Sequence, residues 1–220
     1  MNAVHRIVGN ILLLIPALLL GFFAAAHFAD GLATDAAVPI PTYMIAGIAM
    51  PKIAYQDAYL SLANVDTRDG EAIIARAEGG LHCGIDRNEL IALLIQGLLH
   101  APASARGWTL LSETLLPVNE QKAAQALSQA LVLAPHEYWL VGARSYDAAL
   151  LWKQLDADSQ ENALEQTRLL WLEPALHGQL SRLLLTHEGV SIVTMAFANQ
   201  PDELREMNRW LSKERTRTSN

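Results

Sequence analysis

Three prolines that end apolar segments at a nearly regular spacing constrain this chain more than any other feature. They stand in Leu99-His100-Ala101-Pro102, Val132-Leu133-Ala134-Pro135 and Trp171-Leu172-Glu173-Pro174, 33 and 39 residues apart. Proline lacks a backbone N–H and its ring clashes with the preceding turn, so each of these prolines fixes the end of a helix. A period of about 20 to 50 residues predicts a chain of repeated helical units.

Each interval between these prolines divides into two segments with helical periodicity, which predicts one helical hairpin per repeat. In the first interval, Ala105 to Leu116 is followed by a short break and then by Glu120 to Leu133, with Asn119 placed to cap the second helix. Similar patterns predict helices that open at Ile53 and then cover Glu71 to Glu78, Glu137 to Leu155, Gln160 to Leu172, Ala175 to Leu185, Val190 to Ala198 and Pro201 to Trp210. No convincing strand pair emerges, so the predicted fold class is all-α.

The segment before the first proline predicts the most apolar helix of the body. Asp86 is a candidate N-cap, and Glu89 three residues later completes a capping-box pattern. The following residues, Leu90 to Leu99, are apolar on nearly every face apart from Gln96. Such a helix is expected to lie in the centre of the core.

The residues around the second proline resemble the tetratricopeptide repeat. In that family an aromatic residue and a Leu-Gly pair mark the first helix of each hairpin, and small residues and a closing proline mark the second. The matching residues here are Trp108, Ala123, Leu127, Ala130 and Pro135, followed by Tyr138 and Val141-Gly142. The resemblance covers about residues 86–185, most clearly 103–150, and Ser112 and Gln166 depart from it. It implies an α-solenoid of helical hairpins, in which small residues allow neighbouring helices to approach closely.

The resemblance also implies a concave surface lined by the first helix of each hairpin, where a protein partner would bind. The partner-binding residues implied by the matched positions are Arg106, Thr109, Glu113, Trp139, Ala143, Tyr146 and Asp147. The alternative is that the repeats pack together and leave no accessible groove.

An apolar segment near the amino terminus predicts a membrane anchor. Residues 7–29 contain no formally charged side chain over 23 positions, which is long enough to cross a hydrocarbon core of about 30 Å. Arg6 precedes this segment and Asp30 follows it, so the positive-inside rule predicts a cytoplasmic amino terminus and a body on the far side. The alternative is a cleavable signal peptide, for which Ala24-Ala25-Ala26 offers a cleavage site.

These features predict four parts of the chain. The anchor occupies residues 1–30, and an apolar linker interrupted by Pro39 and Pro41 occupies residues 31–52. The helical-repeat domain covers residues 53–204. A basic tail with a net charge of +3 covers residues 205–220, whereas the whole chain carries −7.

The sequence lacks the patterns that would indicate catalysis, a cofactor or a metal. The net negative charge argues against nucleic acid, because phosphate binding needs a basic surface. The single cysteine, Cys83, can form neither an intramolecular disulfide nor a thiolate cluster. Phosphate-binding glycine loops, HExxH and GxSxG are all missing. We therefore expect a protein that is not an enzyme and uses no cofactor.

Two hypotheses about function follow. The first is an inner-membrane protein with its helical domain in the periplasm, acting as an adaptor that holds a protein partner in an envelope assembly. Polysaccharide assembly or export is the first choice of pathway, with cytochrome maturation and cell division as alternatives. The second is an accessory subunit of a stable membrane complex. An enzyme built on a degenerate solenoid would need a pocket with converging polar groups.

Overall fold

The computed structural model describes residues 55–56, 59–60, 62–63 and 69–218, and every regular element in this part of the chain is helical. The all-α prediction is confirmed there. The predicted anchor at residues 7–29 and the linker at 31–52 lie outside the described residues. Among the helices that are described, none has both the length and the apolar character needed to cross a membrane.

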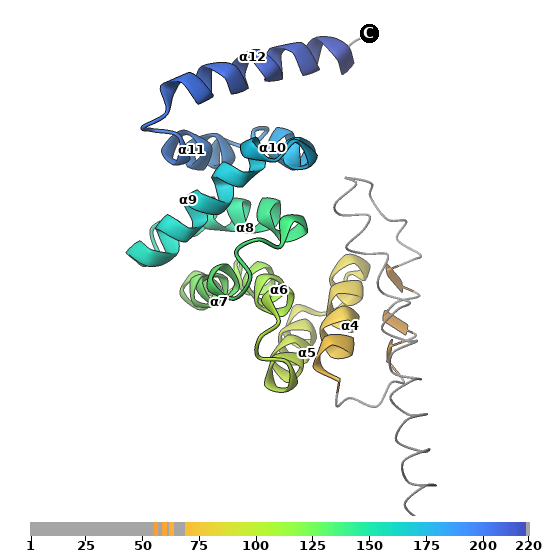
Figure 1. Cartoon of the computed structure of the whole chain (residues 1–220). Coiled ribbons are helices and arrows are strands. Elements are labelled where there is room, and N and C mark those ends of the chain that lie inside the picture. Colours follow the sequence, from red (N-terminus) through yellow and green to blue (C-terminus); the bar gives the residue numbers. More distant parts are fainter. Residues whose placement is uncertain (1–54, 57–58, 61, 64–68, 219–220) are drawn as a thin grey trace, which may run out of the picture.

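The helices follow one another as hairpins that stack along one direction (Figure 1). Helix α4 packs on α5, α6 on α7, and α8 on α9, while α11 packs against both α8 and α9. Their bounds are α4 Gly70–Cys83, α5 Arg87–His100, α6 Ala105–Leu115, α7 Glu120–Leu133, α8 Tyr138–Leu150, α9 Ala157–Leu172, the 3₁₀ turn η1 Pro174–Leu176, α10 His177–Leu183, α11 His187–Ala196 and α12 Pro201–Thr218.

The predicted helix ends are confirmed where the chain carries a local signal. Helices α5, α7 and α9 all end two residues before the prolines at 102, 135 and 174. Asp86 caps α5 by accepting hydrogen bonds from the N–H groups of Asn88 and Glu89, and Asn119 caps α7 by accepting one from Lys122. These side chains satisfy N–H groups that have no partner inside the helix.

Several helix boundaries differ from the sequence expectation. Helix α8 ends at Leu150, and α9 begins at Ala157 rather than Gln160, because Asp156 accepts a hydrogen bond from the Ser159 N–H at 2.7 Å and caps the helix. The polar residues expected to form a break therefore form the first turn of α9. Helix α12 continues past Trp210 to Thr218.

Helix α12 packs on the end of the stack through aromatic contacts. The Trp171 indole Nε1 donates a hydrogen bond to Glu203 Oε2 at 2.7 Å, and the Trp210 ring meets the Trp171 ring edge-on at a centroid distance of 6.0 Å. Met207 of α12 is buried as well, at 2% exposure. The beginning of the predicted basic tail is therefore part of a helix that packs on the body.

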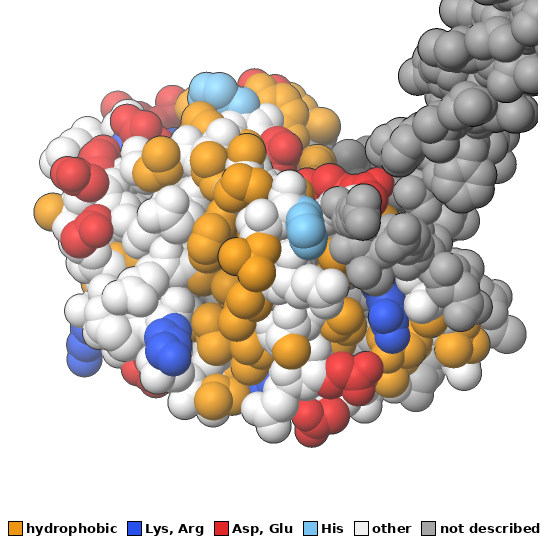
Figure 2. Space-filling view, turned by 90° about the horizontal axis from the view of Figure 1, so that it is seen from below, with side chains coloured by type: hydrophobic (Ala, Val, Ile, Leu, Met, Phe, Trp, Pro, Cys, Tyr) orange, Lys and Arg blue, Asp and Glu red, His pale blue; other side chains and the backbone are white. Residues whose placement is uncertain are grey.

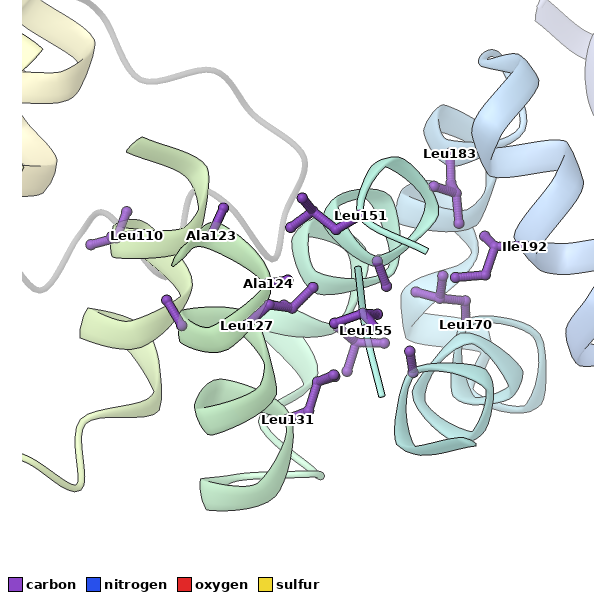
Figure 3. Close-up of a cluster of buried hydrophobic side chains, with 14 of the residues drawn as sticks. Leu110, Ala123, Ala124, Leu127, Leu131, Leu151, Leu155, Leu170, Leu183 and Ile192 are labelled. Atoms are coloured by element: carbon purple, nitrogen blue, oxygen red, sulfur yellow. The ribbon is translucent and has the colours of Figure 1, made fainter. Parts of the chain in front are cut away.

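A continuous apolar core connects the hairpins (Figure 3). The side chains labelled in Figure 3 follow one another from α6 and α7, through the turn between α8 and α9 and through α9 itself, to α10 and α11. Ala123, Ala130, Ala148 and Ala163 are completely buried, and their small side chains allow the helices to approach closely. Each fully buried leucine in this core contributes about 1.5–3 kcal/mol of hydrophobic stabilisation.

The expectation that the helix Leu90 to Leu99 is central in the core is wrong. Helix α5 buries Leu90, Leu94 and Leu98 but leaves Ile95 49% and Leu99 77% exposed. It packs against α4 and α6 and has no further helix of the described chain on its outer side. Its all-round apolar character therefore produces an exposed apolar surface.

Arg144 on α8 is a completely buried cation that connects several elements. Its Nε donates to Thr109 Oγ1 of α6 at 3.1 Å, and its Nη1 donates to the Ala134 carbonyl at 2.6 Å and to Gln166 Oε1 of α9 at 3.4 Å. Nη2 lies 3.6 Å from a carboxylate oxygen of Glu137. Desolvation lowers the pKa of Arg144 to about 10, against the opposing effect of Glu137, so the guanidinium stays charged at neutral pH.

Arg144→Ala is therefore expected to destabilise the fold by about 3–5 kcal/mol, because it leaves buried acceptors without a donor and opens a cavity. Arg144→Met should cost less, since it restores volume but not the hydrogen bonds. Urea unfolding followed by tryptophan fluorescence measures both. Arg205→Ala is the control at a side chain that is 71% exposed and should change the free energy of unfolding by less than about 0.5 kcal/mol. Equal effects of the Arg144 and Arg205 changes would contradict this role.

Candidate functional site

A pocket of about 300 Å³ lies between α8 and α10. Its α8 wall is formed by Trp139, Gly142, Ala143 and Tyr146, and its other wall by Gln179, Arg182, Leu183 and Thr186. The two walls come from the first helices of consecutive hairpins. Three of the sequence-predicted groove residues, Trp139, Ala143 and Tyr146, are thus brought together on one wall. Their predicted role in partner binding stays a prediction.

Gln179 joins the two walls of this pocket. Its Oε1 accepts a hydrogen bond from the Gly142 N–H at 2.8 Å, and its Nε2 donates to the Tyr138 carbonyl at 3.3 Å. The amide approaches the α8 backbone this closely because position 142 has no side chain: a Cβ there would lie 2.4 Å from Gln179 Oε1. Gly142 and Gln179 together set the spacing of α8 and α10, and hence the width of the pocket.

The three predicted residues on α6 have different environments. Arg106 forms an ion pair with the buried carboxylate of Glu78 on α4. Thr109 is only 2% exposed, donates to the Ala105 carbonyl and accepts from Arg144. This burial is contrary to the expectation of a groove-facing side chain, because the packing of α8 on α6 covers it. Glu113 is exposed.

Asp147 on α8 is only 5% exposed, although the sequence placed it on the groove surface. Desolvation raises its pKa well above the usual value, the negative charge of Glu113 raises it further, and the nearby Ser112 hydroxyl opposes the change. Neither Asp147 Oδ2 nor Ser112 Oγ makes a well-oriented hydrogen bond. The pKa of Glu113 is also raised, by desolvation and by the negative charge of Glu78.

No protein-family model, curated protein or solved structure matches this chain. Its candidate site therefore rests on the geometry of its own residues.

A second surface is almost purely apolar. Figure 2 shows the molecule from below, the side on which α5 lies in Figure 1, and a stripe of hydrophobic side chains crosses this face. Between α5 and α6 lies an apolar groove of about 270 Å³, lined by Ile95, Leu98, Leu99, Trp108 and Leu111. Such a patch rimmed by polar residues is typical of a protein interface.

The residues that line these two surfaces are mostly aromatic and aliphatic. The α8–α10 pocket is lined by aromatic, aliphatic and amide groups, and among the described residues that line it Arg182 alone is charged. Within the described part of the chain, no three His, Cys, Asp or Glu side chains are grouped in a way that could hold a metal ion.

Sequence reasoning missed the second wall of the pocket. Gln179, Arg182 and Leu183 lie on α10, where the predicted helix was not assigned to the groove. A signal was present, since Gly178 stands 36 residues after Gly142, close to the spacing of the prolines. The buried role of Arg144 had no comparable local signal.

Gly142→Ala is expected to displace Gln179 and destabilise the protein by about 1–3 kcal/mol, because the added methyl group overlaps the amide. Gly178→Ala is the matched control: nothing lies within 4 Å of its added Cβ, so helix propensity should make it neutral or stabilising by up to about 1 kcal/mol. Thermal unfolding of both variants measures the difference. If the Gly142→Ala protein were as stable as the control, the close contact between the Gln179 amide and the α8 backbone would not require a glycine at position 142.

Asp147→Asn is expected to raise the melting temperature at pH 8 more than at pH 4. Because the pKa of Asp147 is raised in the folded protein, wild-type stability falls as pH rises from the unfolded pKa of about 3.9 to the folded value, and the variant lacks this fall. Melting temperatures of variant and wild type across this pH range test the sign. A difference independent of pH would mean that the carboxyl group titrates normally.

Proposed function

We propose that this protein is a membrane-anchored adaptor with a tetratricopeptide-like solenoid whose concave side binds an extended segment of a protein partner. The observation that carries the proposal is the α8–α10 pocket, which combines Trp139, Ala143 and Tyr146 on one wall. Aromatic side chains next to a small residue provide a shaped apolar recess, and such recesses anchor side chains of bound peptides.

The environment of the pocket supports a binding role rather than an enzymatic one. Gln179 is engaged with the α8 backbone, and the Arg182 Nε donates to the Gly178 carbonyl of its own helix. The polar groups of the pocket are thus held in place by the protein, and its lining residues provide no acid–base pair.

The proposed location follows from the sequence. The uncharged residues 7–29, preceded by Arg6, support a single inner-membrane span with the helical body in the periplasm. There the body would organise an envelope assembly, with polysaccharide assembly or export as the first choice of pathway.

The experiment is co-purification of partners with the full-length protein after cross-linking in native membranes. Ala143→Arg fills the pocket from a half-buried position and is expected to remove the partner. Gln129→Arg, at an exposed position on α7, introduces the same charge elsewhere and should leave the partner bound. Retention of every partner by Ala143→Arg would overturn the groove as the binding site.

The exposed apolar groove between α5 and α6 favours a second candidate, an accessory subunit of a stable membrane complex. Leu99, which lines this groove and is 77% exposed, is the position at which to test it. If Leu99→Arg removes the partners and Ala143→Arg keeps them, the stable subunit is the better description.

A further inference from the structure

The polar groups of the α8–α10 pocket divide into acceptors that the protein already uses and donors that it leaves free. Gln179 Oε1 accepts a hydrogen bond from the Gly142 N–H at 2.8 Å. Thr186 Oγ1 accepts one from the Gly189 N–H at 3.0 Å and donates to the Leu183 carbonyl at 2.9 Å. The two side-chain acceptors of this wall are thus already occupied by N–H groups of the protein.

Three donors that line the pocket lack such partners. In the part of the chain that the structure describes, the Trp139 indole N–H and the Tyr146 hydroxyl make no hydrogen bond, and Arg182 uses only its Nε, which donates to the Gly178 carbonyl at 3.2 Å. Tyr146 is 38% exposed, Arg182 is exposed and Trp139 is half-buried. An indole and a guanidinium can only donate, so a ligand that displaces water from these groups must offer acceptors.

Arg182 also brings an uncompensated positive charge to the pocket. The ion pairs between described residues involve Arg106, Arg144, Arg168 and Arg205, and none of them involves Arg182. The described residues that line the pocket include no carboxylate. Since the whole chain carries a net charge of −7, the pocket is a local reversal of sign that favours an anionic group of a ligand.

The apolar part of the pocket lies along one face of α8. Trp139, Ala143 and Tyr146 follow one another at spacings of four and three residues, so the two rings lie on either side of the small residue. On the facing wall, Arg182 lies one helical turn after Gln179, the residue that contacts α8. An apolar side chain therefore fits between the rings, with its anionic neighbour against the arginine.

We infer that the pocket binds an apolar side chain of the partner segment that stands beside a carboxylate, and that Arg182 holds this carboxylate. The inference rests on the proposed function and names the chemistry of its ligand. A guanidinium pairs with both oxygens of a carboxylate in one plane, which provides orientation as well as affinity. Trp139 and Tyr146 supply further donors for these oxygens or for backbone carbonyls of the segment.

The charge of the site matches a carboxylate better than a phosphate. A phosphorylated side chain carries a charge of about −1.5 to −2 at neutral pH, and its oxygens are matched by a cluster of arginines. Arg182 is the sole charged residue among the described residues that line the pocket. A single carboxylate has two sources in a peptide, an acidic side chain and the carboxyl terminus, and the test below distinguishes them.

The test is selection of displayed random peptides with free carboxyl termini on the full-length protein in detergent micelles. We expect enrichment of an apolar residue at a constant offset from a carboxylate. In a synthetic peptide from this set, neutralising that carboxylate should weaken binding at least about tenfold, as loss of a charged hydrogen bond implies. Replacement of Asp by Asn or Glu by Gln neutralises a side chain, and amidation neutralises the terminus, so the change that has the effect identifies the source.

Arg182→Gln should bind the unmodified peptide about tenfold more weakly than wild type, and the neutralised peptide should lose little further affinity on this variant. Added salt should weaken binding to wild type more than binding to Arg182→Gln. Arg209→Gln is the matched control, because Arg209 is also exposed and its Nε also donates to the carbonyl four residues earlier, that of Arg205. It should bind the peptide as wild type does, and the melting temperatures of both variants should match that of wild type.

Ala143→Phe fills the recess without adding a charge and separates the two possible failures. If selected peptides lose binding to Ala143→Phe but carry no carboxylate at a constant position, or bind Arg182→Gln unchanged, the carboxylate site is wrong and the groove remains. If no selected peptide depends on Ala143, the proposed function and this inference fail together.

Discussion

The burial of the Arg144 guanidinium is the interaction on which the arrangement of the hairpins depends. A charged group in an apolar interior is stable only when its hydrogen bonds are satisfied by neighbours in fixed positions. Here Nε and Nη1 have such neighbours, which belong to α6, to the segment before Pro135 and to α9, whereas Nη2 makes no hydrogen bond and lies 3.6 Å from a Glu137 carboxylate oxygen. The relative positions of two consecutive hairpins are thereby set by one side chain in addition to the apolar core.

This interaction gives α8 two separate tasks. Its inward residues, Arg144, Ser145 and Ala148, are buried and connect the hairpins, whereas Trp139, Ala143 and Tyr146 face the pocket. Because α8 is held by the buried residues, the pocket residues are presented from a rigid element, which suits specific recognition. Gln179 completes this arrangement by fixing α10 against the α8 backbone.

The sequence predicted much of the fold because helix ends depend on local chemistry. Prolines 102, 135 and 174 and the caps Asp86 and Asn119 act on neighbouring backbone groups, and the structure has these helix ends. The sequence predicted only one wall of the pocket. The repeat pattern is less regular at the short helix α10, so that helix was not assigned to the groove. The tetratricopeptide-like solenoid is a proposal that rests on this sequence pattern.

What the sequence alone determined is the helical class, most helix boundaries and the face of α8 that carries Trp139, Ala143 and Tyr146, all of which follow from periodicity and local hydrogen bonding. Only the tertiary structure decided the exposure of α5, the burial of Thr109 and Asp147, and the partners of Arg144. Exposure depends on which distant helix covers a side chain. Local patterns fix the face of a helix on which a residue lies, but they do not specify what packs against that face.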